Sequence, residues 1–298
     1  MKRYRRIRKA PQPDLVDLHV HSSASDGSIS PAAVVRHAAE VGLKAIALTD
    51  HDTVAGVAEA IAAGAECGVE VIAGVEISAE FEPGACHILG YFIDCNDGAL
   101  GEVLAEARDS RKFRNEKILE RLNCLGLAMT TDEVAGRVKD GVVTRGHFAA
   151  VMVAKGYVKS WDDAFDRYLG RDRPAFVPRL HVTPETAIEV VRRAGGLAVL
   201  AHPRQLGFSP RETDAYIEKL AAAGLDGVET ASPDHTVNLG RRYRAAVERL
   251  SLVETGGTDW HGRDDGGIHL GLGRGSMAIH YVLVEKMKAR LARRNIAT

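Results

Sequence analysis

Histidine and carboxylate residues stand at short spacing at the end of the first apolar segment of the chain. His19 and His21 are two residues apart, and Asp26 follows shortly after them. In a β-strand, residues two apart lie on the same face, so the two imidazoles would point to the same side. Imidazole and carboxylate groups are ligands of transition-metal ions, and paired imidazoles are poor material for an apolar core. The spacing therefore predicts two arms of a metal site at a strand end.

The same residue types recur at further apolar segments, mostly at their C-terminal ends. Six of the twelve histidines belong to this set, which a random scatter of satisfied polar side chains would rarely produce. The further candidate ligands are His51, Glu76, His87, His202, Asp259 and His261. With the first three they make nine metal-competent residues.

Seven short apolar segments are typical of buried strands. They lie at residues 15–20, 44–50, 69–78, 86–92, 197–203, 226–230 and 250–256. Amphipathic helical segments separate most of them; one begins at Ser30 and Pro31 and ends at Gly42. This alternation predicts an α/β fold with a parallel sheet close to a seven-stranded (β/α) barrel. Because the C-terminal strand ends form the active-site face of such barrels, the candidate ligands would meet there.

The alternation stops between residues 99 and 180, where the sequence is helical and charged. We expect a helical insertion domain here, carried on a barrel loop and capping the active site. The barrel domain would then comprise residues 14–98 and 181–298, with residues 1–13 as a basic, disordered tail. Binding of RNA or of a membrane surface by this tail is the alternative.

The composition excludes several classes of protein. A formal net charge of -1 over 298 residues argues against a protein that coats nucleic acid. No apolar run is long enough to span a bilayer, so we expect no membrane partner, and no segment indicates a stable protein partner. The four cysteines form no CxxC pair, which predicts reduced thiols and a cytoplasmic location.

The motifs DLHVHSSASDG, TDHD, GVE, AHP and TDWH occur in an order that resembles the polymerase and histidinol phosphatase (PHP) family. The resemblance extends from about Asp14 to Ile268, interrupted by the helical segment. It implies a distorted seven-stranded barrel with a trinuclear metal centre, in which all nine candidate residues match ligand positions. It groups His19, His21, Glu76 and Asp259 on one ion, Glu76, His87 and His202 on a second, and Asp26, His51 and His261 on a third.

Mixed imidazole and carboxylate ligation without thiolate suits Mn²⁺, Zn²⁺ or Fe²⁺, and we favour Mn²⁺. Two cations about 4 Å apart lower the pKa of a bridging water and neutralise the oxygens of a phosphate ester. We therefore expect a metal-dependent phosphoesterase, with Glu76 as the bridging carboxylate and Asp259 beside it. The proton donor to the leaving group is either His235 or a metal-bound water.

Substrate choice would depend on the insertion and the nearby loops. Thr144, Arg145 and His147 stand at the start of a predicted helix, where an arginine and a histidine make a phosphate clamp. Further candidates are Arg173, Arg204 and His235. We interpret the basic helix face of Arg108, Arg111 and Lys112 as solvated.

The long insertion with its TR-x-H element resembles the TrpH-like subgroup of the family, whose members resemble 3′,5′-nucleoside bisphosphate phosphatases. The resemblance implies removal of the 3′-phosphate from such a nucleotide, or trimming of short RNA from its 5′ end. Histidinol-phosphate phosphatase and a separate exonuclease module are enzymatic alternatives. A non-catalytic metal-binding or nucleotide-binding module is the alternative from another class.

Overall fold

The computed structural model describes residues 14–137, 143, 145–177, 182–262 and 267–297. The predicted tail at residues 1–13, the candidate Thr144 and the predicted boundary at residues 180–181 lie outside this part of the chain. Within it, no helix is long and apolar enough to cross a membrane.

All seven predicted strands are present in one sheet. They are β1 (Val16–Val20), β2 (Ala45–Leu48), β3 (Glu70–Ala79), β4 (Cys86–Tyr91), β5 (Leu197–Leu200), β6 (Gly227–Ala231) and β7 (Val253–Gly256). Their order in the sheet is the order in the chain, from β1 to β7. Each strand therefore pairs with its sequence neighbour, as in a barrel.

The expectation of an entirely parallel sheet is wrong for β4, which runs antiparallel to both β3 and β5. Only residues 80–85 connect β3 to β4, and a parallel connection needs a crossover of a dozen or more residues. The reversal has a useful consequence for the site. His87, near the start of β4, pairs with Ser78 near the end of β3, so it lies at the same edge as the other strand ends.

The barrel is nearly closed by the segment that follows β7. The backbone N–H of Asp259 donates to the carbonyl of His19 at 2.9 Å, and His21 donates to the carbonyl of Trp260 at 2.9 Å. A Cβ on Gly257 would lie 2.2 Å from the Cβ of His19, so only glycine permits this approach. These contacts bring the last candidate ligands against the first ones and confirm the predicted α/β barrel.

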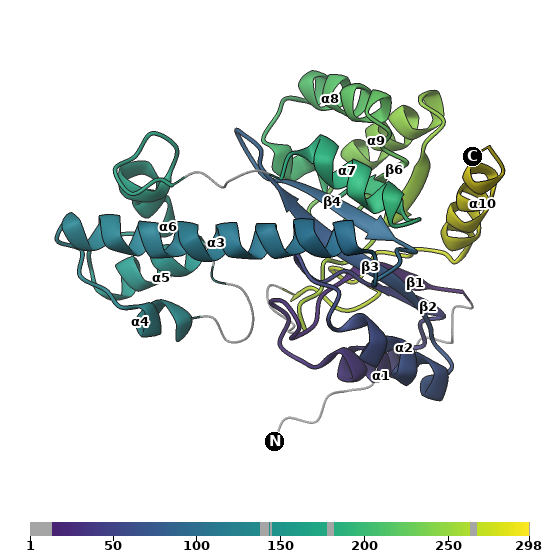
Figure 1. Cartoon of the computed structure of the whole chain (residues 1–298), viewed down its shortest axis with the longest axis horizontal. Helices are drawn as coiled ribbons and strands as arrows, with labels where there is room; N and C mark the ends of the chain where they lie inside the picture. The colour runs from purple at the N-terminus through teal and green to yellow at the C-terminus, as the bar shows by residue number, and fades with distance from the viewer. Residues whose placement is uncertain (1–13, 138–142, 144, 178–181, 263–266, 298) are drawn as a thin grey trace.

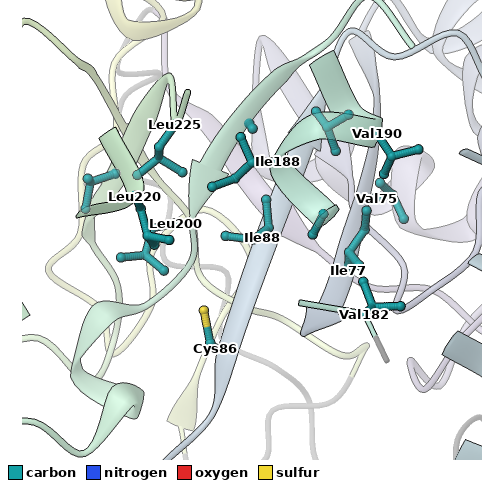
Figure 2. Packing of buried hydrophobic residues seen from close by; sticks show 14 of the residues in the cluster. Val75, Ile77, Cys86, Ile88, Val182, Ile188, Val190, Leu200, Leu220 and Leu225 are labelled. Atoms are coloured by element: carbon teal, nitrogen blue, oxygen red, sulfur yellow. The ribbon is translucent and has the colours of Figure 1, made fainter. Parts of the chain in front are cut away.

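Helices cover the barrel on the outside (Figure 1). They are α1 (Pro31–Val41), α2 (Val57–Cys67), α7 (Pro184–Arg193), α8 (Pro210–Ala222), α9 (Val237–Arg249) and α10 (Val282–Ala297). The Ser30 side chain caps α1 and Gly42 ends it in the left-handed conformation, as predicted. Figure 2 shows one part of the core, where Ile77 and Ile88 of the sheet lie near Ile188 of α7.

A second group of helices follows β4 and precedes β5 in the chain. It comprises α3 (Gly98–Cys124), α4 (Thr131–Ala135), α5 (Arg145–Ala154), α6 (Trp161–Ala164) and the π-helical turn η1 (Phe165–Leu169). Helix α3 runs outward from the barrel in Figure 1. Leu100 and Leu104 near its start belong to the barrel core, whereas Ile118 and Leu122 pack in a separate cluster with Phe148 of α5. The division into domains at residues 99 and 180 stays a prediction.

Candidate metal centre

The nine candidate ligands gather at the edge of the barrel where β1, β2, β3, β5 and β7 end and β4 begins. Three groups have one ligand atom per residue, all within 4.8 Å of one another. They are His19, His21, Glu76 and Asp259; His21, Asp26, His51 and His261; and His51, Glu76 and His87. The antiparallel course of β4 is what brings His87 into the last group.

Glu76 lies at the middle of this cluster and is completely buried. Its Oε1 is 2.8 Å from Nδ1 of His87 and 2.9 Å from Nε2 of His202. Its Oε2 is 3.0 Å from Nδ1 of His51, 3.2 Å from Nε2 of His21 and 3.3 Å from Nε2 of His19. One carboxylate thus contacts five imidazoles, which is the position expected of a group that bridges cations.

Electrostatics keep the two central carboxyl groups ionised. Burial would raise the pKa of Glu76, but the imidazoles of His51 and His19 outweigh it and hold that pKa well below its usual range. Burial likewise opposes ionisation of Asp259, yet His19 and His21 hold its pKa well below the usual range. Both carboxylates are therefore available as anionic ligands at neutral pH.

The first group matches the first ion set that the family resemblance implies. Nε2 of His21 lies 3.1 Å from Oδ1 of Asp259, and Nε2 of His19 lies 3.4 Å from the same oxygen. Both nitrogens are buried and have no hydrogen-bond partner. Buried polar atoms are normally paired, so nitrogens that converge on carboxylate oxygens in this way fit a metal ion.

The other two groups differ in part from the implied sets. His21 joins Asp26, His51 and His261, and its ring stacks on that of His261 with centroids 4.2 Å apart. His51, rather than His202, completes the group with Glu76 and His87. The ring of His202 nevertheless lies 5.1 Å from that of His87. The assignment of each ligand to an ion stays a prediction.

The sequence did not single out Glu229, a completely buried carboxylate on β6. Its Oε1 lies 3.1 Å from Nδ1 of His19, and its Oε2 accepts a hydrogen bond of 2.7 Å from the backbone N–H of His202. A carboxylate on the second ring nitrogen fixes the tautomer and orientation of a metal-binding histidine. The signal in the sequence was a charged residue inside the short apolar segment DGVET.

We expect Glu229→Gln to weaken Mn²⁺ binding by roughly 10- to 100-fold. The neutral amide accepts a hydrogen bond from the His19 ring more weakly than the anionic carboxylate does. Titration of metal-depleted protein with Mn²⁺ would measure this affinity. Glu254→Gln is the matched control, since Glu254 lies on the neighbouring strand β7 and bonds to Thr230 and Arg244 instead. An unchanged affinity in Glu229→Gln would show that His19 is oriented without this carboxylate.

Two further buried carboxylates hold the loops that carry ligands. Asp50 accepts hydrogen bonds from the backbone and hydroxyl of Ser22 and from the hydroxyl of Ser25, beside Asp26. Asp17 accepts from the backbone and hydroxyl of Thr258, next to Asp259. Burial raises the pKa of Asp17 to about 6 although these hydrogen bonds favour its ionised form. Asp50 thus fixes the loop that carries Asp26 to the barrel, and Asp17 fixes the segment that carries Asp259.

Of the candidate phosphate clamp, Arg145 and His147 lie in the first turn of α5. Burial lowers the pKa of the half-buried His147, and the negative charge of Asp26 opposes this shift. The guanidinium of Arg145 lies 5.8 Å from the ring centroid of Phe165 and 5.6 Å from that of Phe176. Arg145 lines a cavity of about 250 Å³ on the side of β3.

The remaining substrate candidates have different surroundings. Arg173 is exposed, and the structure gives it no contact with the centre. Arg204 donates to the backbone carbonyl of Asp234 at 2.5 Å, joining two loops beside the strand ends. The side chain of His235 is 2% exposed, and burial lowers its pKa against the opposing charge of Glu229. The His235 ring lies 3.3 Å from the backbone carbonyl of Thr230 and 3.6 Å from the carboxylate of Asp234.

The interpretation of the basic face of α3 as solvated is wrong for Arg111, which is 6% exposed. Its guanidinium lies 2.5 Å from Oδ2 of Asp52 and 2.8 Å from the hydroxyl of Ser78. Arg108 donates to the backbone carbonyl of Asp52 at 2.7 Å. Asp52 directly follows the ligand His51, so α3 is attached to the loop that presents this ligand.

Comparisons with known proteins agree with this geometry. The family described as PHP domain matches residues 17–168. A 5′-3′ exoribonuclease of Haemophilus influenzae is 36% identical over 82% of this chain and 89% of its own. A 3′,5′-nucleoside bisphosphate phosphatase of Chromobacterium violaceum is 33% identical over 93% and 98%. A solved structure from Bifidobacterium adolescentis, designated a metal-dependent phosphoesterase, superposes with a TM-score of 0.76 at 30% identity, covering 94% and 97%.

Proposed function

The chain belongs to the PHP domain family of metal-dependent phosphoester hydrolases, and from this premise we propose that it removes the 3′-phosphate from 3′,5′-nucleoside bisphosphates. The observation that carries the proposal is the buried Glu76 carboxylate. Five imidazoles contact it, and they belong to the eight other metal-competent residues at the same edge of the barrel. The similarity to a bisphosphate phosphatase over nearly the whole chain supports this substrate.

We propose that the nine residues hold three divalent ions in the sets that the family resemblance implies, with Mn²⁺ as the favoured metal. Such ions supply a water of lowered pKa and neutralise the oxygens of the scissile phosphate. Glu76 and Asp259 contribute anionic oxygens, which the surrounding imidazoles keep ionised although burial opposes this. The donor set contains no thiolate, which fits this choice of metal.

Residues outside the nine would bind and orient the nucleotide. Arg145 offers a planar fork for the 5′-phosphate, and His147 follows it in the first turn of α5. Because His235 follows the C-terminal end of β6, it is the proposed proton donor or a group that positions the leaving oxygen. We place the enzyme in the cytoplasm, since its four cysteines are free.

A second candidate function is the trimming of short RNA from its 5′ end. The 36% identity with the exoribonuclease of Haemophilus influenzae favours it. The two activities need the same hydrolytic centre and differ in the ester that is cleaved. RNA trimming cleaves a phosphodiester between two nucleotides, whereas the phosphatase cleaves a terminal phosphomonoester.

Hydrolysis of three substrates in the presence of Mn²⁺ tests the proposal, with released phosphate and released nucleotide both measured. The substrates are adenosine 3′,5′-bisphosphate, histidinol phosphate and a short 5′-phosphorylated RNA. We expect the bisphosphate to give the highest kcat/KM and to yield adenosine 5′-monophosphate as the product. Preferred hydrolysis of histidinol phosphate, or loss of the 5′-phosphate in place of the 3′-phosphate, would overturn the assignment.

A further inference from the structure

We propose that the cavity beside α3, here called the α3 cavity, binds the nucleobase of the substrate. This inference rests on the proposed nucleotide specificity and adds a site for the part of the nucleotide that the reaction leaves unchanged. The α3 cavity has a volume of about 360 Å³, which suits a ligand of nucleoside size.

The α3 cavity begins at the metal centre and follows one face of α3. His51 and Asp52 line its inner end, and the α3 residues that line it are Arg108, Arg111, Lys112, Asn115, Glu116 and Leu119. Their spacing of three and four residues places them on one helical stripe. The rise from the first to the last is about 16 Å, so a ligand in this cavity could reach from the centre well into the helical group.

The chemistry of the cavity changes along its length. Arg108 and Lys112, both exposed, supply positive charge near the metal centre, and Lys112 makes no ion pair within the described residues. The outer end is apolar, with Leu119 of α3, Val134 of α4 and Phe148 of α5. A ligand that is anionic at the reacting end and flat and apolar at the other end matches this gradient, as a nucleotide does.

The residues in the first turn of α5 indicate how the three substituents of one ribose could occupy three different sites. Arg145 lines the separate cavity beside β3, and Phe148, three residues later, lines the α3 cavity. Two residues of this turn thus line two different cavities. A ribose carries a 3′-phosphate, a 5′-phosphate and a base in diverging directions. If the 3′-phosphate lies at the metal centre and the 5′-phosphate lies at Arg145, the base would occupy the α3 cavity.

Binding of two matched ligands to the Mn²⁺-supplied protein tests this inference by calorimetry. Adenosine 5′-monophosphate and ribose 5-phosphate share the sugar phosphate and differ in the base. We expect the nucleotide to bind about tenfold tighter or more, because only the nucleotide carries a base that can contact the apolar end of the cavity. Leu119→Asp should remove most of this preference by placing a charge in the apolar end, and ribose 5-phosphate should bind as before.

Two further variants keep the test decisive. Thr131→Trp introduces a bulky side chain at an exposed position of the cavity wall and should also abolish the preference, without burying a charge. Leu125→Asp is the control, because Leu125 is 44% exposed and lines no part of the α3 cavity. Equal affinity of the two ligands for the wild type, or a preference that survives both cavity variants, would overturn the inference. Failure of the proposed function would instead appear as no phosphate release from adenosine 3′,5′-bisphosphate.

Discussion

Glu76→Gln should lower kcat/KM by roughly 10³-fold or more and reduce the metal content of the purified protein. The substitution keeps the size of the side chain and removes the charge that five imidazoles contact. An amide cannot bridge two cations as a carboxylate does, so both the metal sites and the hydrolytic water would be affected. Steady-state kinetics with Mn²⁺, together with elemental analysis, would measure the two effects.

The fold should survive this change, because Glu76 contributes to the barrel through its backbone ladder with β4. Glu70→Gln is the matched control at the opposite end of β3, where Glu70 pairs with Lys288 away from the centre. Thermal unfolding of both variants should remain cooperative. Near wild-type turnover of Glu76→Gln would refute the bridging role of this carboxylate.

Arg145→Ala should separate two substrates that differ in one phosphate. The planar guanidinium can hold two phosphate oxygens, and charge-assisted hydrogen bonds contribute roughly 1.5–3 kcal/mol each. Loss of one such bond corresponds to about 10- to 150-fold in kcat/KM for adenosine 3′,5′-bisphosphate. Adenosine 3′-monophosphate lacks the 5′-phosphate and should be hydrolysed by the variant almost as by the wild type.

Two controls accompany this prediction. Arg145→Lys keeps the charge but not the fork and should recover only part of the activity. Arg167→Ala removes an exposed arginine of the same helical group, which pairs with Asp163, and should leave both substrates unaffected. If Arg145→Ala slowed both substrates equally, Arg145 would act at the scissile phosphate or in the fold. If neither slowed, the second phosphate would bind elsewhere.

The strands and most of the site could be predicted because their signals are local. Spacing of two residues placed His19 and His21 on one strand face, and the strand ends collected the other candidate ligands. The antiparallel direction of β4 was not predicted, because an apolar segment such as residues 86–92 does not indicate whether its strand pairs in parallel or antiparallel. The short connection at residues 80–85 was the available signal, since it has no room for a crossover helix.

The residues that support the ligands could not be predicted in the same way. Glu229 meets His19 across 210 positions of sequence, and Arg111 meets Asp52 across 59. Such pairs depend on how the barrel closes and how α3 lies on its edge, which local spacing does not encode. For Arg111 the usual position of a charged residue on a helix face predicted solvent, whereas tertiary packing buries its guanidinium against a carboxylate.

The number of metal ions bound per chain tests the proposed multinuclear centre most directly. Elemental analysis should be made on protein purified without chelator and again after reconstitution with Mn²⁺, with Glu76→Gln measured in parallel. We expect at least two ions per wild-type chain, three when all the ligand sets are filled, and fewer in the variant. Fewer than two ions in the reconstituted wild type would contradict the assignment of this strand edge as a multinuclear hydrolytic centre.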